Sequence, residues 1–191
     1  MKALKDAILR EGIAIGTKIV KVDSFLNHKI DVALSRQMGE AFYAEFSDMQ
    51  VDCILTIEAS GISIAMMTAQ AFGDIPVIIA KKGDHSNIGN DVYTADVYSF
   101  THQRMNTIRV SKKYLTPGLR VLIIDDFLAN GEALMGLRSI LEEAGCVLVG
   151  AGICVEKGFQ PGGKKLREGG LKVVSLAIVD AIDDGKIILR D

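Results

Sequence analysis

Apolar residues along the 191-residue chain gather in short runs separated by amphipathic stretches. The runs are rich in β-branched residues and too short for helices, so each predicts a strand buried on both faces of a sheet. Between the runs, apolar residues recur at spacings of three and four, which predicts helices with one buried face. The predicted strands are Val51–Ile57, Ile75–Ala80, Val121–Ile124, Val147–Val155 and Leu171–Val179, and the predicted helices include Asp31–Ser47 and a stretch that ends at Phe72. This alternation predicts an α/β fold with a mainly parallel sheet and helices on both faces.

The stretch Val121–Ala133 contains an apolar strand followed by residues that can form a ligand-binding site. The strand is followed by Asp125 and Asp126, then by a short loop that ends at Gly131, and then by a helix. The backbone N–H groups of such a loop and of the helix N-terminus favour an anion. Paired carboxylates beside them suit sugar hydroxyls or a hydrated Mg2+. The pattern alone also fits an ordinary strand-to-helix turn with a solvated acidic cap.

Two further features follow predicted strands of the same sheet. Ser60 and Gly61 stand between the strand Val51–Ile57 and a helix, and Gly61 permits a close backbone approach. Lys81 and Lys82 follow the next strand directly. Ligands of open α/β sheets bind at the carboxyl ends of the strands, so both features are candidates for anion binding. Taken singly, Ser-Gly before a helix is also a common cap, and a lysine pair is usually a solvated surface feature.

The remaining segments are interpreted from weaker signals. The N-terminal region predicts a short helix over Lys2–Arg10, followed by an extended segment. Gly83–Asn90 is polar and rich in Gly and Asn, which predicts a mobile loop. Val92–Phe100 and Thr107–Val110 can pair as two strands of an arm. We expect the tail that ends at Asp191 to pack against the N-terminal region.

Composition excludes several classes of protein. The chain carries 22 Lys and Arg against 24 Asp and Glu, a formal net charge of −2, which gives no general attraction to nucleic acid or to an anionic membrane. No apolar run approaches the roughly 18 residues of a membrane span, and the charged N-terminus is unlike a signal peptide. Cys53, Cys146 and Cys154 lie in apolar segments without metal-type spacing, which indicates reduced core thiols. We therefore expect a cytoplasmic protein of one domain, without nucleic-acid or membrane partners.

The motif Asp-Asp-Phe-Leu-Ala-Asn-Gly over 125–131 resembles the phosphoribosyl diphosphate (PRPP) signature of the type I purine phosphoribosyltransferases. Within that family it is most similar to the xanthine enzymes, which the arm segment Thr94–Thr101 and the segment around Asn27 also resemble. The resemblance covers nearly the whole chain. It implies the type I phosphoribosyltransferase fold in a single domain spanning 1–191, with a flexible loop and a small hood. The hood is expected from about residues 1–30 plus the C-terminal tail.

The resemblance implies transfer of the phosphoribosyl group of PRPP to xanthine, giving xanthosine 5′-phosphate and diphosphate in purine salvage. It implies Mg2+ carried by PRPP, with no direct metal ligand from the protein, and a homodimer. The loop would hold the 5′-phosphate, the acidic pair the ribose hydroxyls, and the serine, glycine and lysines the pyrophosphate. The implied PRPP-binding residues are Asp125, Asp126, Ala129, Asn130, Gly131, Glu132, Ala133, Ser60, Gly61, Lys81 and Lys82.

The same resemblance implies the residues that bind the base. Asn27 would hydrogen-bond the purine, and Val20 would line its pocket, mostly through main chain. Lys157 would donate to the exocyclic oxygen of the purine, and Phe159 would stack on its face. Hypoxanthine-guanine relatives carry an Asp at the position where this chain has Ala129. Because alanine has no carboxylate, we assign no general base.

Three alternatives remain open at this point. Guanine or hypoxanthine is the rival main substrate within the same reaction. A PRPP-sensing regulator of this fold that binds nucleic acid would need a basic face or an added domain, which the charge balance and length disfavour. A dinucleotide enzyme is disfavoured because no Gly-x-Gly-x-x-Gly follows a predicted strand.

Overall fold

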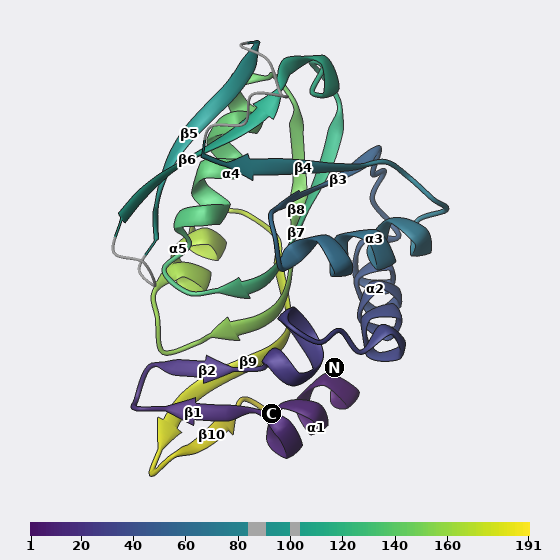
Figure 1. The fold of residues 1–191 in the computed structure, drawn as a ribbon. Coiled ribbons are helices and arrows are strands. Elements are labelled where there is room, and N and C mark those ends of the chain that lie inside the picture. Colours follow the sequence, from purple (N-terminus) through teal and green to yellow (C-terminus); the bar gives the residue numbers. More distant parts are fainter. Residues whose placement is uncertain (84–90, 100–103) are drawn as a thin grey trace.

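The structure, a computed structural model, describes residues 1–83, 91–99 and 104–191 (Figure 1). The helices are α1 (Lys2–Glu11), α2 (Val32–Phe46), α3 (Gly61–Ala71), α4 (Glu132–Glu143) and α5 (Gly162–Glu168), with a π-helical turn at Asp23–Asn27 and a 3-10 turn at Lys112–Tyr114. The strands are β1 (Ile13–Ile15), β2 (Ile19–Lys21), β3 (Cys53–Ile57), β4 (Val77–Lys82), β5 (Val92–Ser99), β6 (Arg104–Ser111), β7 (Arg120–Leu128), β8 (Val147–Lys157), β9 (Val173–Asp183) and β10 (Lys186–Leu189). In the described residues, no helix is long and apolar enough to cross a membrane.

Among the described residues, eight strands form one sheet in the order β10-β9-β8-β7-β3-β4-β6-β5. The five strands from β9 to β4 run parallel to one another. Antiparallel strands extend both sides, β10 beside β9 and the β6–β5 arm beside β4. The predicted α/β class with a mainly parallel sheet is confirmed.

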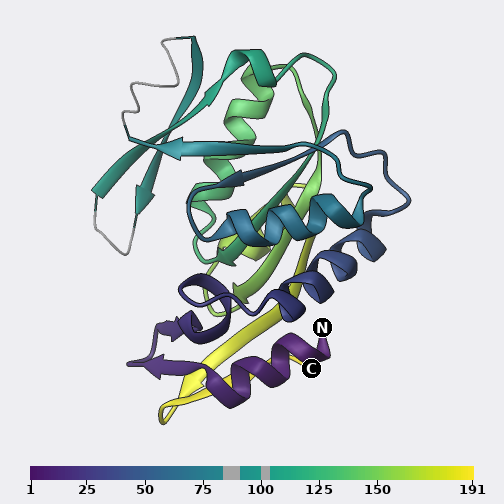
Figure 2. The same cartoon turned by 45° about the vertical axis from the view of Figure 1, so that its right-hand side comes forward.

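Helices cover both faces of the sheet, as predicted. α1, α2 and α3 pack on one face and α4 and α5 on the other. Figure 1 shows α2 and α3 on one side of the parallel strands and α4 and α5 on the other, and in Figure 2 α3 has come forward. Side chains of β7 alternate between the two cores, with Leu122 and Ile124 in the first and Val121 and Ile123 in the second. Because both faces of the strand are buried, the sequence shows an unbroken apolar run rather than an alternating one.

The two ends of the chain build a small unit beside the sheet, the hood of the sequence analysis. α1, the β1–β2 hairpin and β10 lie together, and both termini meet there (Figure 1). The side chain of Lys5 donates to the carbonyl of Arg190 at 2.6 Å, and the N-terminal amine donates to the carbonyl of Leu176. The tail therefore packs against the N-terminal region as the sequence predicted.

Several predicted boundaries differ from the structure. β7 continues through Asp125 and Asp126 to Leu128, because its backbone stays paired with β8 as far as Glu156. β4 likewise includes both lysines that were placed after it. The helix α5 was not predicted, because its sequence begins with Gly-Gly, which disfavours helix. The mobile-loop prediction for Gly83–Asn90 falls, apart from its first residue, outside the described residues.

An ion pair ties β3 to β7 at the edge of the sheet away from the carboxyl ends of the parallel strands. Asp52 accepts hydrogen bonds from the backbone N–H and the Nε of Arg120, both at 2.8 Å, and is also paired with Nη2. These bonds to the guanidinium and the backbone hold the pKa of Asp52 at about 2, below its usual range. A carboxyl group with a lowered folded pKa stabilises the fold at neutral pH and loses that contribution as pH falls.

We therefore expect Asp52→Asn to lower the melting temperature at pH 7 and to flatten the loss of stability between about pH 4 and about pH 2. Thermal unfolding followed by circular dichroism across that range measures both effects. Glu142→Gln is the control, since it removes an exposed i,i+4 pair with Arg138, and such pairs contribute little. Identical acid profiles for wild type and Asp52→Asn would contradict the assignment.

Candidate phosphate and purine site

A cleft of about 350 Å3 opens at the carboxyl ends of the parallel strands. The continuous stretch Asp125–Leu134 lines it, together with Ser60 and Lys82 from neighbouring strand ends. Tyr98 and Asn106 of the β5–β6 arm line it from the other side. The structure thus brings most of the residues predicted to bind PRPP to one cleft.

The loop Ala129–Gly131 is fixed in shape by its own backbone and by α5. Gly131 has φ +92°, a left-handed conformation that side-chain-bearing residues rarely adopt, and it immediately precedes α4. The N–H of Gly162 donates to the carbonyl of Ala129 at 3.1 Å. Among the described residues, no side chain caps the N-terminus of α4, so its first-turn N–H groups are available to an anion.

The two carboxylates of the acidic pair have different surroundings. Asp125 is buried and accepts the backbone N–H of Asp126 at 2.9 Å. Burial, reinforced by the charge of Asp126, raises the pKa of Asp125 well above its usual range. Asp126 is half-buried at the cleft and accepts a hydrogen bond from Nδ2 of Asn27 at 3.3 Å. Both carboxylates line the cleft, where Asp125 is buried and Asp126 is half-buried.

The loop after β3 borders the same cleft. Ser60 lines the cleft, and Gly61 begins α3. A Cβ on Gly61 would lie 2.3 Å from Oγ1 of Thr56 and 3.1 Å from Oδ1 of Asp125. The close approach at Gly61 is therefore to the protein's own side chains. The peptide bond between Glu58 and Ala59 in this loop is cis.

Glu58 contacts both lysines of β4, but in different ways. Its carboxylate accepts the backbone N–H of Lys82 at 2.6 Å and pairs with Nζ of Lys81 at 3.0 Å. Lys82 lines the cleft, whereas the Lys81 side chain is held by Glu58. Sequence reasoning did not single out Glu58, although a carboxylate between a buried strand and Ala-Ser-Gly was a usable signal.

Base-binding candidates gather near the hood. Nζ of Lys157, the last residue of β8, donates to the carbonyl of Lys18 at 3.1 Å and lies 5.9 Å from the ring centroid of Phe127. Partial burial lowers the pKa of Lys157. Phe127 lines the cleft and follows Asp126, the partner of Asn27. Lys157 and Asn27 thus each lie next to a residue that lines the cleft, Phe127 and Asp126 respectively.

The side chains of Phe159 and Val20, two predicted base contacts, do not line the cleft. Phe159 is half-buried and packs against the first hydrophobic core, and the side chain of Val20 is buried in that core. Only the main chain of Val20 is therefore available to a ligand. Phe127 lines the cleft, as does Tyr98 of the β5–β6 arm, and the sequence analysis treated Phe127 as part of a loop. Its position directly after the acidic pair was the available signal.

The mainly parallel sheet, the glycine loop before α4 and the acidic pair are the features expected of a protein that binds a phosphorylated sugar at the carboxyl edge of its sheet. A family model described as the phosphoribosyl transferase domain matches residues 22–182, so the chain belongs to the phosphoribosyltransferase family. Within it, the chain is similar to xanthine phosphoribosyltransferases over its whole length. It is 50% identical over 190 residues to that of Clostridioides difficile, covering 100% of both chains. It is 53% identical over 187 residues to that of Ruminiclostridium cellulolyticum, covering 98% of both chains.

Solved structures show the same fold. The crystal structure of adenine phosphoribosyltransferase from Rhodothermus marinus matches with a TM-score of 0.74 at 22% identity, covering 93% of this chain and 99% of that one. The enzyme from Giardia lamblia, complexed with 9-deazaadenine, matches with a TM-score of 0.73 at 20% identity, covering 92% of this chain and 96% of that one. The expected type I phosphoribosyltransferase fold is thereby confirmed.

Proposed function

We propose that this chain transfers the phosphoribosyl group of PRPP to xanthine, giving xanthosine 5′-phosphate and diphosphate in purine salvage. The observation that carries the proposal is one cleft lined by the whole stretch Asp125–Leu134 together with Ser60 and Lys82. Xanthine is proposed as the substrate because about half of the residues, over the full chain, are identical to those of relatives named xanthine phosphoribosyltransferases.

Each part of PRPP has a matching set of groups. The loop Ala129–Gly131 and the first turn of α4, with Glu132 and Ala133, hold the 5′-phosphate through backbone N–H groups. Asp126, with Asp125 behind it, faces the ribose hydroxyls. Lys82 and the backbone near Ser60 and Gly61 stabilise charge on the departing diphosphate, with Lys81 held beside them by Glu58. Positioning and electrostatic stabilisation then supply most of the rate, because the purine nitrogen displaces diphosphate without a covalent enzyme intermediate.

The described residues fit a Mg2+ that arrives with PRPP. They contain no group of three or more His, Cys, Asp or Glu side chains able to hold a metal alone. A hydrated Mg2+ bound by substrate phosphates needs only one or two carboxylates, and Asp126 at the cleft offers oxygen ligands of that type. The bound ion would neutralise charge on the diphosphate.

Free thiols at all three cysteines agree with a reducing compartment such as the cytoplasm.

No residue is proposed as a general base. The position where hypoxanthine-guanine relatives carry an aspartate is Ala129, which has no titratable group. Xanthine loses a proton near neutral pH, so it is a competent nucleophile without help. This departure also favours xanthine over guanine and hypoxanthine as the main substrate.

Base selection is proposed to rest on Lys157 and Asn27. The ammonium of Lys157 has three donors, so it can keep its bond to Lys18 and donate to the 6-oxo group of a purine. Adenine carries an amino group there and offers no acceptor. Asn27 donates one N–H to Asp126 and retains its amide oxygen and a second N–H for the 2-position of the base.

Lys157→Ala should weaken all 6-oxopurines together, because it removes a charge-assisted hydrogen bond that contributes about 1.5–3 kcal/mol, or about one to two decades in affinity. Asn27→Ala should narrow the ratio of kcat/KM for xanthine to that for hypoxanthine, since hypoxanthine has no substituent at the 2-position. Steady-state kinetics with both bases measure the two effects. If Asn27→Ala left the ratio unchanged, the hood would not read the 2-position.

The proposed assembly is a homodimer, for which the support is the family resemblance. A groove of about 520 Å3 beside β4 is lined by apolar side chains such as Val77, Ile79 and Val110, and also by the cationic residues Lys81, Arg109 and Lys113. Multi-angle light scattering of an active preparation at micromolar concentration should give twice the chain mass of 20.6 kDa. A monomer mass under those conditions would contradict the homodimer.

The reaction itself is tested by product detection. PRPP, Mg2+ and xanthine incubated with the protein should yield xanthosine 5′-phosphate and diphosphate, identified by mass spectrometry, and omission of any one component should abolish both. Absence of the nucleotide in the complete mixture, with folded protein, would refute the proposal.

A further inference from the structure

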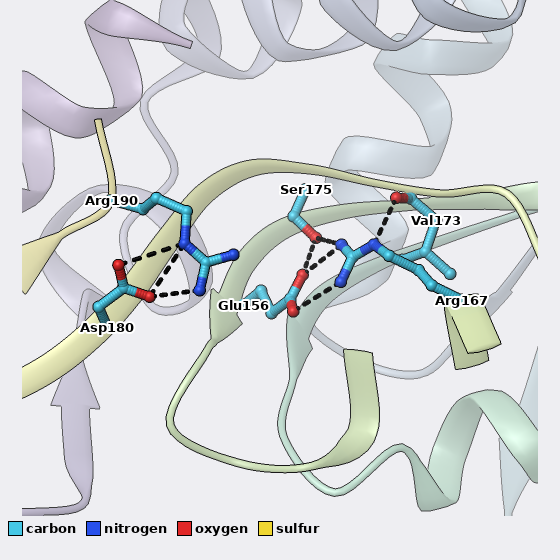
Figure 3. A network of polar contacts seen from close by, with 6 residues as sticks. All are labelled: Glu156, Arg167, Val173, Ser175, Asp180 and Arg190. Carbon is cyan, nitrogen blue, oxygen red and sulfur yellow. Dashed lines mark hydrogen bonds and ion pairs between the residues drawn. The ribbon is translucent and has the colours of Figure 1, made fainter. Parts of the chain in front are cut away.

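An ion pair between a buried carboxylate, Glu156, and a half-buried guanidinium, Arg167, lies at the carboxyl end of β8 (Figure 3). Glu156 is 3% exposed, and its two carboxylate oxygens accept Nη1 and Nη2 of Arg167 at 2.9 and 2.6 Å. The hydroxyl of Ser175 also donates to Glu156, and Nε of Arg167 donates to the carbonyl of Val173 at 3.2 Å. A two-pronged bond of this kind fixes orientation as well as distance.

The ion pair fixes the position of α5 against the sheet. Arg167 is in the last turn of α5, while Glu156 is on β8 and Ser175 on β9. A Cβ on Gly163 would lie 2.0 Å from Oε1 of Glu156, so the start of α5 lies directly on the carboxylate. A seven-residue helix that begins with Gly-Gly has little stability of its own, so its position depends on these contacts.

The other side of α5 contacts the phosphate loop. The N–H of Gly162 donates to the carbonyl of Ala129, and a Cβ on Gly162 would lie 2.3 Å from that oxygen. Gly131 faces Gly162 and Leu166, with a Cβ position 3.4 Å and 3.5 Å from their nearest atoms. On the strand side, Glu156 is the backbone partner of Leu128, the residue that precedes the loop. Both supports of the loop therefore meet at Glu156.

We propose that Glu156 is a positioning residue for the 5′-phosphate loop: by holding Arg167 and Ser175 it fixes α5, whose Gly162 sets the position of Ala129. The inference rests on the proposed function, because the loop is taken to bind the 5′-phosphate of PRPP. Glu156 itself does not line the cleft and touches no substrate.

The test is calorimetric titration with ribose 5-phosphate, which carries the 5′-phosphate without the diphosphate, and with PRPP and Mg2+. Glu156→Gln keeps the shape of the side chain and removes its charge, and it should raise both dissociation constants by between about tenfold and about a hundredfold, as expected for a binding group displaced by about 1 Å. Ser175→Ala removes the hydrogen bonds of the hydroxyl to Glu156 and to Arg167 and leaves the ion pair, so a smaller rise is expected.

Asp52→Asn is the matched control, because it breaks a second multidentate Arg–carboxylate pair at the opposite edge of the sheet. It should lower the melting temperature and leave both dissociation constants unchanged, which separates positioning from general stability. If Glu156→Gln does not fold, Ser175→Ala decides: a rise absent from Asp52→Asn supports the inference, and no rise overturns it. Unchanged binding by a folded Glu156→Gln also overturns it. Failure of the wild type to bind either ligand would instead refute the proposed function.

Discussion

Gly131→Val should reduce the affinity for PRPP by at least about a hundredfold, because it distorts the loop that is proposed to hold the 5′-phosphate. Gly131 has φ +92°, which valine, branched at Cβ, adopts only with strain. Its Cβ would also lie 3.4 Å from the backbone of Gly162, and the further atoms of valine would extend beyond that. The loop must then move, and its N–H groups no longer point toward the bound phosphate. Calorimetric titration with PRPP and Mg2+ measures the effect.

Gly118→Val provides the matched control. Gly118 also has a left-handed backbone, φ +83°, but a Cβ there meets nothing within 4 Å, and it lies in a turn away from the cleft. This variant should suffer comparable backbone strain and lose stability without losing affinity for PRPP. Unchanged PRPP affinity in a folded Gly131→Val protein would remove the loop from the phosphate site.

The double variant Asp125→Asn, Asp126→Asn should lower kcat/KM by about a hundredfold to a thousandfold, the range seen when a charge-stabilising group is removed. Both carboxylates lie at the end of β7 and line the cleft, one buried and one half-buried. Removing both charges deprives the ribose hydroxyls and the hydrated Mg2+ of their anionic partners, so activation by Mg2+ should weaken as well. Initial rates across a Mg2+ titration measure both quantities.

The two single variants separate the contribution of Asp126 to activity from that of Asp125. Asp126→Asn should retain the fold, since the side chain is half-buried and faces the cleft. Asp125→Asn should also alter stability, because Asp125 is buried and accepts the N–H of Asp126. Asp91→Asn, at an exposed carboxylate outside the cleft, serves as the control. Full Mg2+-dependent activity in the double variant would exclude both residues from the site.

The sequence predicted the sheet because burial on both faces leaves a clear signal, as at Val121–Ile124. It placed the end of β7 too early, because Asp125 and Asp126 look like a solvated end. The backbone continues to pair with β8, and both carboxylates line the cleft, Asp125 buried and Asp126 half-buried. Local polarity cannot reveal a strand whose polar residues serve a site.

Contacts between distant segments were the least predictable. α5 begins with Gly-Gly, and what holds it is Glu156, a residue of the preceding strand, through Arg167. The sequence likewise suggested Phe159 as the stacking residue; in the structure Phe159 is half-buried against the first core, and Phe127 lines the cleft. In both cases the deciding information is tertiary packing, which residue type and spacing do not contain.

The most direct test of the account is the kcat/KM for PRPP-dependent diphosphate release, measured in parallel with xanthine, guanine, hypoxanthine and adenine. The account predicts that order of preference. Xanthine should be preferred because it has both the 6-oxo and the 2-oxo group. It also ionises near neutral pH, so it needs no general base, and the alanine at position 129 cannot act as one. Adenine should be essentially unused, because Lys157 has no acceptor at its 6-position. A preference for hypoxanthine or guanine over xanthine, or substantial turnover of adenine, would contradict the assignment of the base site.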